Sequence, residues 1–137
     1  MRPFVVGKDE AAWLEVNARA FAGHPEQGRM TLADLRARQA EPWFRADDLL
    51  LAERAGRLVG FAWLKVEGDV GELYALGIDP SAQGGGLGRW LTAAALEHLA
   101  RRGARTGLLY TEATNHAAVH LYTEAGFRRS RVDVQYG

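Results

Sequence analysis

The stretch from Gln83 to Arg89 has the residue types of an anion-binding loop. It reads Gln-Gly-Gly-Gly-Leu-Gly-Arg and lies between an apolar segment and an amphipathic one. Glycines let the main chain adopt positive φ, and the start of a helix presents unpaired N–H groups to an anion. The loop therefore predicts binding of a phosphate or pyrophosphate group, with Arg89 at its end.

Two other types of glycine-rich loop do not fit this stretch. A Walker loop ends in Gly-Lys-Ser or Gly-Lys-Thr, whereas Gly88 is followed by Arg89 and Trp90. A dinucleotide-binding loop would need Gly or Ala at position 91, which is Leu91. A flexible turn is the remaining alternative, but it would need only about one or two of these glycines.

Glu72 is the candidate general base. An unbroken strand alternation places Glu72, Tyr74, Leu76 and Ile78 on one face, unless Gly77 breaks it. A carboxylate at this position can take a proton from an amine, directly or through a water molecule. A solvated glutamate at a strand edge is the competing interpretation, and the residues alone favour it.

Two segments resemble the GNAT acyltransferase superfamily. The first, Gln83-Gly-Gly-Gly-Leu-Gly88, follows Asp79-Pro80 and is similar to the superfamily motif Gln-x-x-Gly-x-Gly. The second runs from Asn115 through Leu-Tyr122 to Gly-Phe127. The resemblance implies an α/β fold with a mixed, mostly antiparallel sheet, helices on both faces and a splayed pair of parallel strands. It also implies acetyl-CoA as co-substrate, with the pyrophosphate in the loop and the pantetheine arm along a bulged strand.

The resemblance also implies roles for individual residues. Glu72 would be the general base, and Tyr122 would stabilise the leaving thiolate and then protonate it. A backbone N–H of the bulged strand would polarise the thioester carbonyl. Asn115 would contact the cofactor or cap a helix, and both roles can coexist. The implied cofactor contacts are Leu76, Gly77, Ile78, Gln83, Gly84, Gly85, Gly86, Leu87, Gly88, Arg89, Asn115 and Ala118.

Further segments resemble one branch of the superfamily, the C-terminal domains of the mycothiol synthases. They include His24-Pro-Glu-Gln-Gly28 and Glu41-Pro-Trp-Phe44. That branch acetylates the amine of a cysteinyl-glucosaminyl-inositol, so the resemblance implies a small-molecule amine acceptor. A peptide N-terminal or lysine acetyltransferase and a non-catalytic acyl-CoA sensor remain as alternatives. The implied acceptor contacts are Glu26, Lys65, Glu72 and Tyr110. Aromatic side chains could line the same site, and at least one of them is expected to be buried instead. These aromatic candidates are Trp43, Phe44 and Trp63.

Composition narrows the remaining classes of function. The 137 residues predict one domain, residues 1–137, and the 17 basic and 17 acidic residues predict no nucleic-acid or membrane partner. The chain has no cysteine, and Ser81 and Ser130 lie outside a nucleophile elbow, so direct acyl transfer is expected. His116 and His120 have helical metal-ligand spacing but are assigned to a solvated face, so no metal is expected. No apolar run suggests a leader or membrane span, which predicts a cytoplasmic protein.

Periodicity predicts the elements that must position these residues. Helices are expected over about residues 10–21, with Asp9 as cap, and after Thr31, with Leu32 and Leu35 inward. A third helix is expected over about residues 87–103. A fourth is expected from Asn115, and its buried residues would be Ala118, Leu121, Tyr122 and Ala125. Strands are expected at residues 2–6, 49–53, 58–66, 71–78, 106–111 and 127–136. The strand–helix–strand unit around the glycine loop predicts a parallel crossover. Either a bend splits the last segment into two strands, or it leaves an open edge that favours pairing with a second copy, so a homodimer is one expectation.

Overall fold

The computed structural model describes residues 1–23, 28–110, 115–122 and 128–136. Within these residues a seven-stranded sheet has its strands in chain order from β1 to β7. Neighbouring strands are antiparallel, except that β4 and β5 are parallel. The strands are β1 (Arg2–Pro3), β2 (Leu49–Arg54), β3 (Arg57–Glu67), β4 (Val70–Ile78), β5 (Thr106–Tyr110), β6 (Asn115–Tyr122) and β7 (Arg128–Tyr136).

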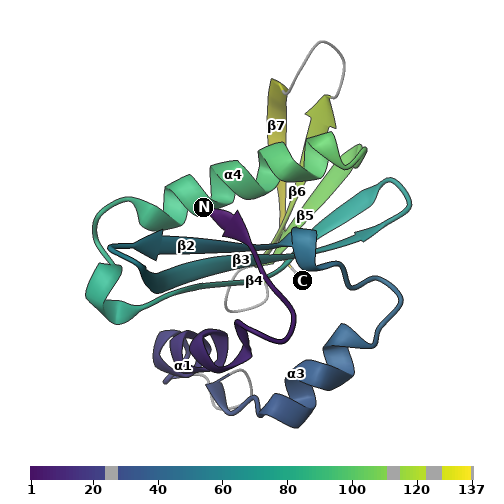
Figure 1. Cartoon of the computed structure of the whole chain (residues 1–137). Helices are drawn as coiled ribbons and strands as arrows, with labels where there is room; N and C mark the ends of the chain where they lie inside the picture. The colour runs from purple at the N-terminus through teal and green to yellow at the C-terminus, as the bar shows by residue number, and fades with distance from the viewer. Residues whose placement is uncertain (24–27, 111–114, 123–127, 137) are drawn as a thin grey trace.

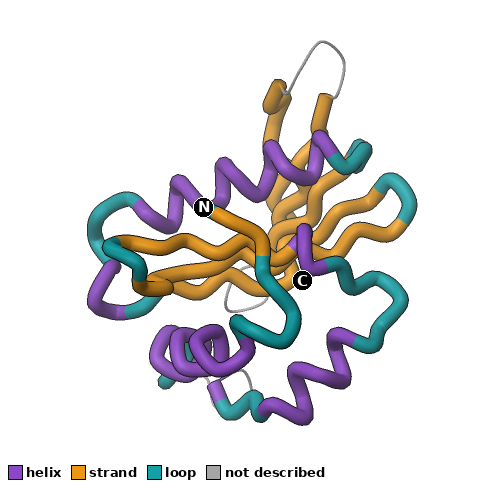
Figure 2. The backbone as a smooth tube through the Cα atoms, viewed as in Figure 1, coloured by secondary structure: helices purple, strands orange, loops and turns teal. Residues whose placement is uncertain are grey.

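Helices cover both faces of the sheet. Helix α4 (Leu87–Arg101) crosses one face, and α1 (Glu10–Ala20) and α3 (Leu32–Gln39) lie against the other (Figure 1). The tube in Figure 2 shows the same three layers, with helices above and below the strands. Two short 3-10 helices, η1 (Ala46–Asp48) and η2 (Pro80–Ala82), precede β2 and the glycine loop. None of the helices described here is long and apolar enough to cross a membrane.

Each face of the sheet has its own hydrophobic core. Successive side chains of a strand point to opposite faces, and β3 supplies both cores in this way. Ala62 and Leu64 pack in the core beneath α4, whereas Phe61 and Trp63 pack in the core beneath α1 and α3. The helices contribute Leu91, Ala95 and Leu99 to the first core and Trp13, Val16 and Leu35 to the second.

The ends of α1 and α3 test the predicted caps. Thr31 and Asp34 form a reciprocal capping box, which confirms the predicted start of α3. Leu32 is 44% exposed, so its inward position is wrong, because α3 buries only Leu35. Asp9 occupies the N-cap of α1 without capping it: its carboxylate accepts two hydrogen bonds from the Arg2 guanidinium, each at 2.8 Å, instead.

The segment from Asn115 to Tyr122 is strand β6, so the predicted helix is wrong there. It pairs with β5 on one side and with β7 on the other. Two ladders give the backbone hydrogen-bonding partners on both sides, which outweighs a weak local helix preference. The sequence also has a period of two, with apolar residues at 117, 119 and 121 alternating with His116 and His120. Ala125, the last residue of the predicted buried stripe, lies outside the described residues.

Candidate functional site

A β-bulge in β4 sets the geometry of the site. Trp63 pairs with Ala75 and Leu64 pairs with Leu73, so Tyr74 is an extra residue without a partner on β3. A bulge of this kind breaks the alternation of side chains along a strand. Tyr74 and Ala75 accordingly both pack against the core beneath α1 and α3.

Glu72 lies on the same face of the sheet as Tyr74. Its neighbours both face α4: a Cβ added to Gly71 would lie 2.5 Å from Leu99 Cδ2, and Leu73 belongs to the core beneath α4. Because side chains alternate along this part of β4, Glu72 points to the face of α1 and α3. Its side chain is half-buried, so the carboxylate remains within reach of a ligand.

Leu76 and Ile78 lie on the other face. Both pack against the core beneath α4, whereas Glu72 and Tyr74 lie on the opposite side of the strand. The unbroken alternation that would put all four residues on one face is therefore wrong. The bulge at Tyr74 shifts the alternation by one residue; the family resemblance implied a bulged strand, but the spacing along β4 alone does not place the bulge.

Strand β4 separates from β5 at the bulge. Parallel pairing runs from Val70 with Thr106 to Leu73 with Leu109, and β5 ends at Tyr110. From residue 74 to residue 78, the β5 side of β4 meets no strand of the described chain. This confirms the expected splayed pair of strands. It also places Leu76, Gly77 and Ile78 on an open strand edge, where the backbone N–H and C=O groups that point away from β3 can bind an extended ligand.

The glycine loop leads directly into the N-terminus of α4. Gly84 and Gly86 have φ of 88° and 81°, and Gly86 is the N-cap, with no side chain to cap the helix. The first helical hydrogen bond runs from the Trp90 N–H to the Gly86 carbonyl, at 3.1 Å. The N–H groups of residues 87–89 therefore lack helical partners and point out of the helix start, as an anion site requires. Gln83 and Arg89 are both exposed beside it.

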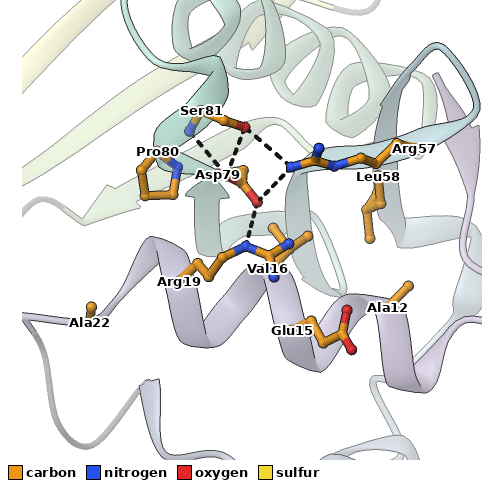
Figure 3. Close-up of a pocket in the computed structure, with 10 residues that line it drawn as sticks. All are labelled: Ala12, Glu15, Val16, Arg19, Ala22, Arg57, Leu58, Asp79, Pro80 and Ser81. Atoms are coloured by element: carbon orange, nitrogen blue, oxygen red, sulfur yellow. Dashed lines mark hydrogen bonds and ion pairs between the residues drawn. The ribbon is translucent and has the colours of Figure 1, made fainter.

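Asp79 holds the chain between β4 and the glycine loop (Figure 3). Its buried carboxylate accepts hydrogen bonds from the Ser81 N–H at 3.0 Å and from Arg19 Nε at 2.7 Å, and Arg57 lies 3.9 Å away. The Ser81 backbone N–H, followed by the Arg19 guanidinium, lowers the pKa of Asp79 to about 2. These residues line a cavity of about 740 Å³ between α1 and η2. The sequence pattern missed this network because Arg19 is 60 residues away.

Lys65 and Glu72 face one another across β3 and β4. They are directly paired in the register of the two strands, so the structure brings these two predicted acceptor residues together. Lys65 Nζ lies 3.7 Å from a carboxylate oxygen of Glu67 and 5.3 Å from the ring centre of Trp43. The ammonium group is thus held beside an aromatic ring on the face of α1 and α3.

The aromatic candidates divide into buried and accessible residues. Trp63 is fully buried, and Trp43 and Phe44 are half-buried against it. Tyr74 joins this cluster, with its ring centre 5.1 Å from that of Trp43 and 5.3 Å from that of Trp63. Tyr74 was not among the predicted site residues. Its position two residues after Glu72 on the same strand could have indicated that it lies on the same face.

The remaining candidates lie on β5 and β6. Ala118 pairs with Leu108, which in turn pairs with Glu72, so these three residues share one row of the sheet. Tyr110 ends β5 and Asn115 begins β6, near the point where β4 departs. Glu26 lies outside the described residues.

Tyr122 lies at the opposite end of the sheet from the glycine loop. His120 pairs with Thr106, which pairs with Val70, so Tyr122 lies beyond the first residue of β4. The loop follows Ile78 at the other end of β4, roughly 30 Å away at about 3.3 Å per residue. The structure therefore does not bring Tyr122 together with the loop.

Comparisons with known proteins identify the family of this chain. The chain matches the acetyltransferase (GNAT) family over residues 12–127. A mycothiol acetyltransferase of Cellulomonas flavigena is 57% identical, over 100% of this chain and 42% of that protein. A mycothiol acetyltransferase of Sanguibacter keddieii is 60% identical, over 98% of this chain and 45% of that protein. The chain thus spans less than half the length of these relatives.

The fold is also similar to that of a solved structure. N-acetylglutamate synthase from Neisseria gonorrhoeae, in complex with coenzyme A and N-acetyl-glutamate, matches with a TM-score of 0.60 and 24% identity. The match covers 82% of this chain and 25% of that one. The family match extends over most of the chain and includes the bulged strand, the splayed pair and the glycine loop. The chain therefore belongs to the acetyltransferase (GNAT) family.

Proposed function

We propose that this domain transfers the acetyl group of acetyl-CoA directly to a primary amine of a small molecule. The observation that carries this function is that the glycine loop and the open edge of β4 meet at one end of the same strand. Unpaired N–H groups at the start of α4 suit the pyrophosphate. The open edge at residues 76–78 suits the amide groups of the pantetheine arm, and one of its N–H groups suits the thioester oxygen.

Glu72 is the proposed general base. An amine attacks as the neutral form, whereas ordinary amines with a pKa of about 8 to 10 are mostly protonated near neutral pH. Glu72 offers a half-buried carboxylate four residues before Leu76, where the open edge proposed for the thioester begins. The ammonium form first gives one proton to Glu72, directly or through a water molecule. The neutral nitrogen then bonds to the acyl carbon, the C–S bond breaks, and sulfur keeps its electron pair. The second nitrogen proton is lost to solvent or to the departing thiolate as the amide forms.

The family resemblance supports the other proposed roles. Tyr122 as acid, and Asn115 and Ala118 as cofactor contacts, rest on the resemblance of their segment to the second GNAT motif. Because the leaving thiolate has a pKa of about 8.5, below that of a phenol at about 10, Tyr122 would first stabilise the sulfur by a hydrogen bond and complete the proton transfer late. Tyr122→Phe should therefore slow acetyl transfer, and an unchanged rate would contradict this role.

The acceptor that we propose is a cysteinyl amine of the kind used in mycothiol assembly. This follows from the names of the two relatives and from the pairing of Lys65 with Glu72 beside Trp43. Glu26 and Tyr110 complete the proposed acceptor contacts. A single domain over residues 1–137, a cytoplasmic location and a homodimer paired through the edge of β7 stay predictions from the sequence.

Kinetics on a panel of amines test the function. The panel pairs acetyl-CoA with cysteinyl-glucosaminyl-inositol, polyamines, aminoglycosides and short peptides, and thiol release is followed. Glu72→Gln should lower kcat by about 100-fold or more while the KM for acetyl-CoA stays within about 3-fold, because the base acts only in the chemical step. Glu97→Gln, on the exposed face of α4, is the matched control and should leave both constants unchanged.

Two other outcomes would contradict this function in different ways. Tight binding of acetyl-CoA with no turnover on any amine would favour the acyl-CoA sensor. Turnover confined to peptides would favour the peptide N-terminal or lysine acetyltransferase, in which case the acceptor is a chain terminus or a lysine side chain.

A further inference from the structure

Tyr74 makes a polar contact that the proposed reaction does not use. Arg38 Nε donates a hydrogen bond to Tyr74 Oη over 2.9 Å. A guanidinium group has no acceptor, so the phenol oxygen must accept in this contact and its own proton remains to be donated elsewhere. Tyr74 is half-buried and follows Glu72 by two residues on the same face, about 7 Å along the strand.

Two aromatic rings fix the position of this phenol. The Tyr74 ring meets Trp63 edge to face at 70° and meets Trp43 at 48°. Tilted and edge-to-face pairs are the favourable arrangements for aromatic rings. Because Trp63 is fully buried whereas Trp43 and Tyr74 are half-buried, the cluster is anchored in the core and accessible at its outer side.

Further hydrogen-bond donors lie on the face of the sheet to which Glu72 points. Lys65 lies beside the ring of Trp43 and opposite Glu72, and its partner Glu67 has a side chain that is 66% exposed. Arg38 donates one further hydrogen bond, to a backbone carbonyl within α3. Tyr74, Arg38 and Lys65 therefore place an O–H and two cationic groups on the face of the sheet to which the proposed base points.

We propose that Tyr74, Arg38 and Lys65 form a subsite for hydroxyl or carbonyl oxygens of the acceptor, an inference that rests on the proposed function. With the reacting amine at Glu72, the rest of the acceptor meets donors and therefore must offer hydrogen-bond acceptors. A polyamine would bring further cations towards Arg38 and Lys65 and is disfavoured. Tyr74 is thus a specificity-determining residue, which selects an oxygen-bearing amine.

Equilibrium binding of two matched acceptors tests this subsite without any turnover. Cysteinyl-glucosamine and the cyclohexylamide of cysteine share the reacting amine and a six-membered ring, but only the first carries hydroxyl groups. Calorimetry in the presence of CoA should show that Tyr74→Phe weakens binding of cysteinyl-glucosamine by about 3- to 10-fold. Binding of the cyclohexylamide and of CoA should change by less than about 2-fold.

Two further variants separate the hydrogen bond from general damage. Arg38→Met should weaken cysteinyl-glucosamine binding in the same direction and add little in the Tyr74→Phe background, because both changes remove one linked contact. Arg36→Met, an exposed arginine of the same helix, is the control and should have no effect.

The outcomes for the subsite and for the enzyme are distinct. Equal binding of the two acceptors to the wild type, no binding of either, or an equal loss of both in Tyr74→Phe would overturn the subsite. Selective binding without acetyl transfer to any amine would leave the subsite standing and contradict the transferase function.

Discussion

A single carboxylate, that of Asp79, connects α1, η2 and β3 at the entrance of the glycine loop. It accepts from Arg19 of α1 and from both the N–H and the hydroxyl of Ser81, and it lies near Arg57 of β3. A buried carboxylate with several donors is stable only while it is charged. Asp79 therefore fixes where the glycine loop begins relative to α1, which lies on the face of the sheet opposite α4.

The pH dependence of stability should show this role of Asp79. Its pKa is about 2 in the folded protein and near 4 in an unfolded chain, so its contribution is complete above about pH 4 and is lost as the pH falls to about 2. Asp79→Asn should destabilise the protein by about 2 kcal/mol at pH 7, and the difference should shrink below pH 4. Urea unfolding from pH 2 to 7 measures it, with the exposed Glu15→Gln of the same cavity as control. A difference that persists at pH 2 would contradict the assignment.

The junction between the glycine loop and α4 is the element on which binding of the donor depends. Gly86 at its start and Gly103 after its end have φ of 81° and 88°, and an added Cβ meets nothing within 4 Å at either site. Alanine at each position should therefore cost a similar 1–2 kcal/mol of stability, by about the same backbone strain. Only Gly86→Ala should also weaken acetyl-CoA binding, by about 10-fold or more, because it moves the N–H groups of the helix start. Thermal unfolding measures the stability of the two variants, and calorimetry measures their affinity for acetyl-CoA. Equal affinities of the two variants would mean that the loop does not bind the donor.

Local and non-local information explain which elements were predictable from the sequence. The glycine loop and α4 were predicted because a helical apolar stripe follows the glycines within one segment of the chain. Strand β6 was not, because its residues carry both periods and the two neighbouring ladders decide between them. The bulge at Tyr74 depends on how β3 pairs with β4, and the Arg38 contact spans 36 residues. Such partners cannot be read from the spacing within one element.

The described chain is a sheet between two helical layers, and its two cores lie on opposite faces of the strands that they share. On the α4 side the helix approaches β4 closely at Gly71, where the Leu99 side chain fills the space that a Cβ would need. On the other side α1 and α3 cover the aromatic cluster that contains Trp63 and Tyr74. The distance between α4 and the sheet therefore also sets where the glycine loop lies relative to the open edge of β4.

A double-mutant cycle at this contact tests the packing of the α4 layer. Gly71→Ala should destabilise the protein by about 1–3 kcal/mol through overpacking, and Leu99→Ala should cost about 2–5 kcal/mol through a cavity. The two changes compensate, since the new Cβ of one enters the space vacated by the other. The double variant should accordingly be more stable than the sum of the single losses by about 1 kcal/mol or more, as measured by urea unfolding. Strictly additive losses would mean that Leu99 does not occupy the space above Gly71, and that α4 lies further from β4.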